Sequence, residues 1–234
     1  MARVNAYVDG FNLYHGAKEL VARLGTTESW KWIDLSQLVQ RICPQDEVVD
    51  IKYFTALVSP TKSDPSLASR QQIYLRALES AGVTVVLGNF MRQTKRMPLA
   101  RQPRWTARRL LQLSRIGAQR HDDGNTSVPV VRTEEKATDV NLGVHLVSDG
   151  FTGDFDRAVV ISNDTDLQEP VRMVAQELGR RVTVVNPRGH RQPAVALRRV
   201  ATDVRNLRIA ALTASQFSDE LHDEIGVFSK PMGW

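Results

Sequence analysis

The sequence predicts a three-layer α/β/α sandwich with a mainly parallel central sheet, and three observations support this class. Helical and strand-like patterns alternate along most of the chain. The chain has 234 residues and is 42% hydrophobic, which is enough to form one main core. Several expected strands are apolar on both faces, as in a parallel sheet that helices cover on both sides, namely residues 83–87, 158–161 and 182–185.

The first half of the chain reads as alternating strands and helices. Gly25 and Gly82 close two of the helices, and Asp34 with Gln37 resembles a capping box at the start of another. In order we expect a strand at residues 3–8, helices at 12–24 and 34–42, a strand at 48–58, a helix at 66–81 and a strand at 83–87.

The second half repeats the alternation after one exceptional segment. Residues 91–121 contain nine Lys and Arg and no acidic residue, and we interpret them as a basic, partly helical insertion in a domain of residues 1–210. The apolar residues of 211–234 show no clean period, so we expect this extension to pack on the domain. The other expected elements are strands at 128–132, 158–162 and 182–186 and helices at 136–147 and 167–178.

Composition limits the functions that need consideration. Cys43 is the only cysteine, which excludes an intrachain disulfide and a multi-cysteine zinc site. The five histidines form no metal-spaced pair. A formal charge of +5 favours a polyanionic partner such as nucleic acid. We find no membrane-length apolar run, no secretion leader and no glycine-rich nucleotide-binding motif, so we expect a cytoplasmic protein without a membrane or nucleotide cofactor partner.

Four carboxylates are expected to share one edge of the sheet. Asp9 follows the first strand, Asp164 and Asp166 follow the strand at 158–162, and Asp139 lies near the start of a helix. Residues at the carboxyl ends of parallel strands line the edge where ligands usually bind. Clustered carboxylates repel one another unless a cation lies between them, and an all-oxygen site suits Mg²⁺ or Mn²⁺. Taken singly, each aspartate could instead cap a helix, and Asp166 before Leu167 is a fair example.

Three strings of residues together resemble the NYN domain family of PIN-like nucleases: YVDGFNL at residues 7–13, EKATDVNL at 135–142 and VISNDTDL at 160–167. The resemblance spans roughly residues 3–190 and implies a Mg²⁺- or Mn²⁺-dependent ribonuclease of PIN-like fold. Under it, Asp9, Asp139 and Asp164 fall on the family's acidic positions, and Asp166 matches a further acid. Asn12 matches the asparagine that accompanies the first acid, and Ser162 matches the hydroxyl residue that braces the site.

The resemblance also suggests residues that contact substrate. Lys136 matches a lysine before the second acid, although a solvated lysine in a first helical turn is nearly as good an interpretation. Asn163 stands where the family often has glycine, and Leu167 where it often has an aromatic residue, so access to the site can differ here. Asn163 remains a candidate substrate contact. Arg188, in the turn after residues 182–186, is a further candidate for phosphate, with a plain polar turn as the alternative.

The basic insertion offers a second surface for RNA. Its arginines could follow a phosphate backbone while Trp105 stacks on an unpaired base, or the segment could be a solvated basic face with Trp105 in a local core. The candidate arginines are Arg101, Arg104, Arg108, Arg109, Arg115 and Arg120.

The sequence therefore favours a metal-dependent nuclease acting on single-stranded RNA, as an endonuclease or an exonuclease. An RNA-binding regulator that keeps the fold without catalysis, and a metal nuclease or phosphatase-like hydrolase acting on DNA or other phosphate esters, are the alternatives. A pure binder would gain nothing from repelling carboxylates beside a phosphate, which favours catalysis. A homodimer that extends the basic surface is compatible with the sequence.

Overall fold

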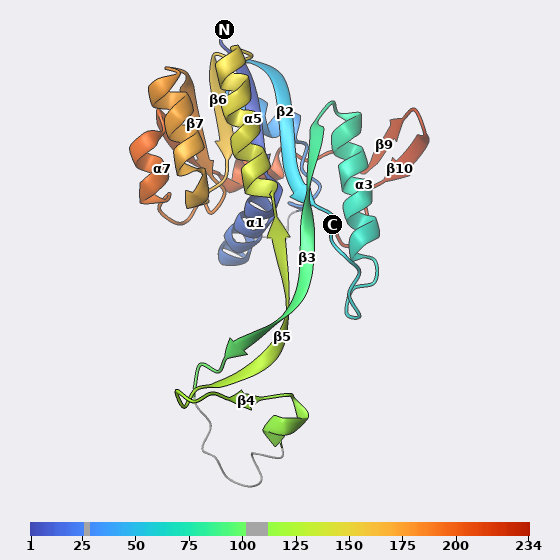
Figure 1. Ribbon diagram of the computed structural model, residues 1–234. Coiled ribbons are helices and arrows are strands. Elements are labelled where there is room, and N and C mark those ends of the chain that lie inside the picture. The colour runs from blue at the N-terminus through green and yellow to red at the C-terminus, as the bar shows by residue number, and fades with distance from the viewer. Residues whose placement is uncertain (26–28, 102–111) are drawn as a thin grey trace. The chain divides into compact units, whose positions relative to one another are not determined.

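The computed structural model describes residues 1–25, 29–101 and 112–234, and it forms two compact units. Unit 1 comprises Met1–Asn89 and Ala137–Trp234, and unit 2 comprises Phe90–Lys136 (Figure 1). Across the described residues, every helix is too short or too polar to cross a bilayer.

The sheet of unit 1 is parallel, as predicted. Its strands lie in the order β3-β2-β1-β6-β7-β8, and each described neighbouring pair is parallel. Their bounds are β1 (Arg3–Asp9), β2 (Glu47–Ala56), β3 (Thr84–Pro98), β6 (Arg157–Ile161), β7 (Arg181–Asn186) and β8 (Asp203–Asn206).

Helices cover both faces of this sheet, and the two buried clusters follow from the alternation of side chains along β1. Val4, Ala6 and Val8 point into a core built with α1 (Gly10–Leu24), α2 (Leu35–Ile42), α3 (Leu67–Ser80) and α8 (Ile209–Thr213). Tyr7 points the other way, into a core built with α5 (Thr138–Thr152), α6 (Gln168–Arg172) and α7 (Val195–Val200). The three-layer sandwich expected from the sequence is thereby confirmed.

Most expected helices occur near their predicted bounds. α1 begins at Gly10, two residues earlier than expected, because Asp9 caps it, and Gly25 ends it in the left-handed conformation at φ 64°. Asp34 caps α2 by accepting from the backbone nitrogens of Ser36 and Gln37. The helix expected at 167–178 is irregular: a 3₁₀ turn at Thr165–Leu167 precedes α6, and a π-helical turn at Met173–Glu177 follows it.

Unit 2 contains much more strand than we expected. β3 does not stop near residue 87 but continues to Pro98, so the first part of the basic insertion is extended rather than helical. Residues 112–115 are helical, and β4 (Gln119–Arg120) pairs antiparallel with β5 (Thr126–Lys136). Arg96 holds this unit together by donating to the Ser127 hydroxyl at 3.2 Å and to the Gly117 carbonyl at 2.7 Å.

The last residues of the chain are part of unit 1. β9 (Glu220–Asp223) and β10 (Gly226–Ser229) form a hairpin, and the Arg76 guanidinium of α3 binds both carboxylate oxygens of Asp223 at 2.6 and 2.7 Å. Phe217 and Phe228 are buried in the same core as Trp32. The indole nitrogen of Trp32 donates to the Ser218 carbonyl at 2.8 Å, so a fully buried polar atom is satisfied by this segment.

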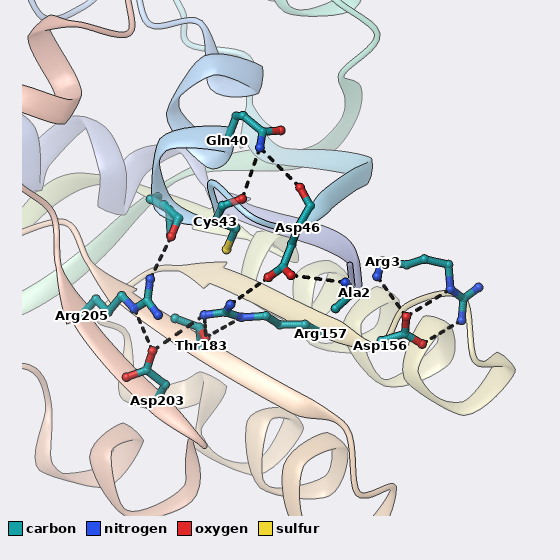
Figure 2. A network of polar contacts seen from close by, with 11 residues as sticks. Ala2, Arg3, Gln40, Cys43, Asp46, Asp156, Arg157, Thr183, Asp203 and Arg205 are labelled. Carbon is teal, nitrogen blue, oxygen red and sulfur yellow. Dashed lines mark hydrogen bonds and ion pairs between the residues drawn. The ribbon is translucent and has the colours of Figure 1, made fainter.

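A buried ion-pair network connects the strands of the sheet at their amino-terminal ends (Figure 2). Arg157 opens β6, and its side chain is only 7% exposed. It contacts Asp46 before β2 at 3.0 Å and donates to the Thr183 hydroxyl of β7 at 2.8 Å. Asp203 at the start of β8 lies 3.8 Å away. These groups tie together the beginnings of four strands, at the edge opposite the predicted acidic site.

Candidate active site

Asp9 and Asp164 follow the two central strands, β1 and β6. Between these strands the order in which strands are added to the sheet changes from one side to the other. β1 is followed outward on one side by β2 and β3, and on the other side by β6, β7 and β8. Ligands in open α/β sheets bind at this switch point, outside the carboxyl ends of the two central strands. β1 ends at Asp9, and β6 ends immediately before Ser162. The strand order thus places the first and third sequence motifs side by side.

Asp9 is buried and held by two different donors. Its Oδ1 accepts from the backbone nitrogen of Asn12 at 2.9 Å, which caps α1, and its Oδ2 accepts from the Ser162 hydroxyl at 2.9 Å. The main chain passes from β1 directly into α1 at Gly10, where a Cβ atom would lie 2.6 Å from the Tyr53 ring. Asp9 therefore acts as the cap of α1, and its role in a catalytic site stays a prediction.

A web of backbone contacts holds the segment that follows β6. The Ser162 hydroxyl accepts from the backbone nitrogen of Asp164 at 3.1 Å, and the Asn12 side-chain oxygen accepts from the backbone nitrogen of Asn163 at 3.1 Å. Asp164 itself caps the following 3₁₀ turn by accepting from the backbone nitrogen of Asp166 at 3.0 Å. The cap at this turn is consequently Asp164, and the alternative in which Asp166 caps the helix is wrong.

Asp139 lies close enough to Asp164 and Asp166 to be affected by their charges. It lies in the first turn of α5, where the helix dipole favours a negative charge. Burial and the neighbouring charges of Asp164 and Asp166 nevertheless raise its pKa, in that order of importance. Ala137, just before this turn, has a left-handed backbone with φ 72°, an unfavourable conformation for alanine that sets the direction of the helix start. The tertiary structure therefore brings like charges together.

Asp164 is connected to both of the other predicted acids, Asp9 and Asp139. It is linked to Asp9 through the Ser162 hydroxyl, and its charge acts on Asp139. Oxygen donors with unrelieved mutual repulsion fit a hard divalent cation. Within the described ranges, no three His, Cys, Asp or Glu side chains form a ready-made metal cage. The residues therefore fit an ion such as Mg²⁺ that binds one or two carboxylates and keeps several waters.

The predicted substrate contacts have different surroundings. The Asn163 side-chain oxygen accepts from the Ala194 backbone nitrogen at 2.8 Å, so it joins the loop after β6 to the start of α7. Arg188 lies 3.6 Å from Glu19 of α1, and Lys136 pairs with Glu134 at 3.0 Å inside unit 2. Arg101, Arg115 and Arg120 are exposed. Arg104, Trp105, Arg108 and Arg109 lie outside the described residues.

The sequence reasoning missed an aromatic pocket that starts at Gly10 and Phe11, directly after Asp9. The pocket has a volume of about 440 Å³. Phe11 and Tyr14 lie one turn apart on α1, which is a weak signal for a shared face. The remaining rings come from distant segments, so no local pattern announces them: Trp30, Tyr53, Tyr74 and Trp234.

Comparison with known proteins places this geometry in a family context. The family model described as the NYN domain matches residues 3–208. The chain is 27% identical to 6-hydroxy-3-succinoylpyridine 3-monooxygenase of Pseudomonas putida, over 79% of this chain, and it spans 59% of the length of that relative. It also resembles the crystal structure of a Vibrio parahaemolyticus protein of unknown function, with a TM-score of 0.50 and 19% identity over 89% of this chain and 94% of that one. The latter likeness concerns the fold alone.

Proposed function

The chain belongs to the NYN domain family, and from this premise we propose that it is a metal-dependent ribonuclease that hydrolyses RNA phosphodiester bonds. The observation that carries the proposal is the position of Asp164 at the switch point. The Ser162 hydroxyl forms hydrogen bonds with the Asp9 carboxylate and with the backbone nitrogen of Asp164. The charge of Asp164 also contributes to the raised pKa of Asp139. Asp166, which also acts on Asp139, is proposed as a supporting acid.

The roles of the side chains follow from their contacts. We assign Asp9, Asp139 and Asp164 to Mg²⁺ or Mn²⁺, with one or two of them binding the ion directly and the others acting through its waters, as exposed Asp166 also does. The chemistry that such a cation supplies when bound is stabilisation of charge on the phosphate and an attacking water of lowered pKa. The bonds from the Asn12 nitrogen and Ser162 hydroxyl fix the orientation of Asp9, so little reorganisation is needed when substrate arrives.

RNA is the proposed substrate, and single-stranded RNA in particular. The formal charge of +5 favours a polyanion, and exposed Arg101, Arg115 and Arg120 give unit 2 a basic surface. DNA hydrolysis, and RNA binding without catalysis, would use the same surfaces. The following assay distinguishes these alternatives from RNA hydrolysis.

The test compares labelled single-stranded RNA and DNA, incubated with Mn²⁺ or Mg²⁺ or with chelator. We expect RNA cleavage that needs the metal and that falls about 100-fold or more in Asp164→Asn. Asp154→Asn is the matched control, because Asp154 is exposed just before β6, at the opposite edge of the sheet. Cleavage that survives chelator, or equal rates for wild type and Asp164→Asn, would defeat the proposal. Preferential DNA cleavage would replace RNA as the substrate.

A second candidate function is oxidation of a small heteroaromatic ring. The name of the Pseudomonas putida relative describes a monooxygenase acting on a substituted pyridine, and the aromatic pocket beside Gly10 could hold such a ring. Incubation with 6-hydroxy-3-succinoylpyridine, dioxygen and a reduced nicotinamide or flavin donor tests this directly. Consumption of the pyridine by the wild type but not by heat-denatured protein would favour it over hydrolysis.

A further inference from the structure

The aromatic pocket lies at the carboxyl end of β1, on the face of the sheet that packs against α1 and α3. Gly10 and Phe11, which follow Asp9 in the chain, line it. Its other walls come from β2, α3 and the segment around Trp30. The volume of about 440 Å³ lies in the range of about 300–1,000 Å³ that small-ligand sites occupy.

The rings leave aromatic surface at the mouth. Tyr14 is 40% exposed, and its ring lies 5.4 Å from that of partly buried Trp30, at an interplanar angle of 42°. Lys31 places its ammonium 5.8 Å from the Trp30 ring. Deeper in the pocket, Tyr74 lies 5.3 Å from Trp234. A planar ring entering here would meet aromatic faces and a positive charge at the entrance.

Polar groups at the pocket wall are fixed in place. Arg70 pairs with Asp64, which presents one guanidinium and one carboxylate together. The Gln71 amide is held by the Ala56 carbonyl at 2.9 Å and by the Val58 nitrogen at 2.8 Å. The wall therefore presents oriented hydrogen-bond donors and acceptors to the edge of a planar ring that has hydrogen-bond donors and acceptors of its own.

We propose that this pocket binds one unpaired nucleobase of the substrate strand. The proposal rests on the ribonuclease function and specifies its substrate as single-stranded. Stacking on aromatic side chains tolerates any base and contributes about 1–3 kcal/mol per base. A base inside a duplex is already stacked and paired, so it cannot enter the pocket without being extruded.

The experiment measures binding separately from cleavage. Fluorescence anisotropy of a short labelled single-stranded RNA is recorded in chelator, with the Asp164→Asn change in every protein. Adding Trp30→Ala should raise the Kd roughly 5- to 100-fold, which is the stacking energy converted at about 1.4 kcal/mol per factor of ten. Tyr14→Ala should weaken binding in the same direction, and Trp30→Phe should retain most of the affinity.

Two controls make the result specific. Phe151→Ala removes an aromatic side chain that is 78% exposed near the end of α5 and lies outside the pocket, so it should leave Kd unchanged. An RNA with an abasic site at the bound position should bind weakly and should no longer respond to Trp30→Ala. Urea unfolding of each variant confirms that the protein is folded.

The outcomes separate the two proposals. Unchanged Kd in both Trp30→Ala and Tyr14→Ala overturns the base pocket, even if metal-dependent cleavage by the wild type is observed. Weakened RNA binding without any cleavage by the wild type retains the pocket and defeats the ribonuclease. Tight binding of 6-hydroxy-3-succinoylpyridine that RNA does not displace also overturns the base pocket.

Discussion

The Ser162 hydroxyl donates a hydrogen bond of 2.9 Å to Oδ2 of Asp9, across two neighbouring parallel strands. The Ser162 hydroxyl oxygen also accepts from the backbone nitrogen of Asp164 at 3.1 Å, and the Ser162 side chain is fully buried. One hydroxyl thereby fixes an acid of the first motif and the backbone of an acid of the third. This contact joins the two motifs in space.

Replacing that hydroxyl should damage the site more than the fold. Ser162→Ala leaves a buried nitrogen and a carboxylate oxygen without this partner, and we expect about 1–3 kcal/mol of lost stability. Cleavage should fall about 10- to 100-fold, the usual cost of losing a group that orients metal ligands. Ser162→Thr retains the hydroxyl and should recover most of the rate. Equal rates for Ser162→Ala and wild type in a Mn²⁺ assay would contradict this role.

Removing the charge of Asp139 should stabilise the metal-free protein. Burial, and after it the charges of Asp164 and Asp166, raise the pKa of Asp139, so its ionised form is less favourable in the folded state than in the unfolded one. In chelator, Asp139→Asn should gain on the order of 1 kcal/mol, seen as a Tm a few degrees higher.

Bound metal should reverse this difference and make the wild type more stable than Asp139→Asn. Mg²⁺ or Mn²⁺ at 100 times its Kd should stabilise the wild type by about 2.7 kcal/mol and should do much less for Asp139→Asn. Thermal scans with and without metal test both statements, with Asp154→Asn as the variant that should behave like wild type. A metal response that is unchanged in Asp139→Asn would remove Asp139 from the cation site.

The Arg157 network should matter for folding and not for chemistry. Arg157→Met leaves the carboxylate of Asp46 near a buried position without its cation, at a cost of about 3 kcal/mol, whereas Asp203 keeps Arg205 at 2.7 Å. Arg3→Met removes a guanidinium from an exposed pair with Asp156 (Figure 2), where solvent screens the interaction, so its effect should be much smaller. Urea unfolding measures both, and the cleavage rate per folded molecule should stay at the wild-type value. A specific loss of rate in Arg157→Met would show that the two edges of the sheet are coupled.

Acid should loosen the hairpin of β9 and β10. Bonds from Arg76 hold the pKa of Asp223 well below its usual value, with further help from the backbone nitrogens of Ile225 and Gly226. A lowered pKa in the folded state gives stability that is present above about pH 4 and is lost as the pH falls further. Asp223→Asn should therefore be less stable than wild type at pH 7, with the two proteins converging in acid. Hydrogen exchange of Glu220–Ser229 across this range is the measurement, and a constant difference down to the lowest pH would refute the pairing.

Much of the fold could be predicted because local patterns fix its elements. Apolar runs in β6 and β7 can only be buried on both faces, and this requires helices above and below a parallel sheet. The local sequence pattern did not predict the full length of β3, in which a run of polar and basic residues continues as strand to Pro98. Such residues carry no period of their own, and the partner strand that makes them extended lies elsewhere in the chain.

The sequence by itself determined that Asp9 and Asp164 follow parallel strands, and hence that they lie at the same edge of the sheet. Only the tertiary structure decided that β1 and β6 are neighbours, so that one hydroxyl of Ser162 reaches both acids. The aromatic pocket likewise exists only after folding, because Tyr14, Trp30 and Trp234 share no local pattern. The physical reason is the same in both cases: hydrophobic periodicity specifies which face of an element is buried, whereas the order of strands and the packing of distant segments depend on the whole chain.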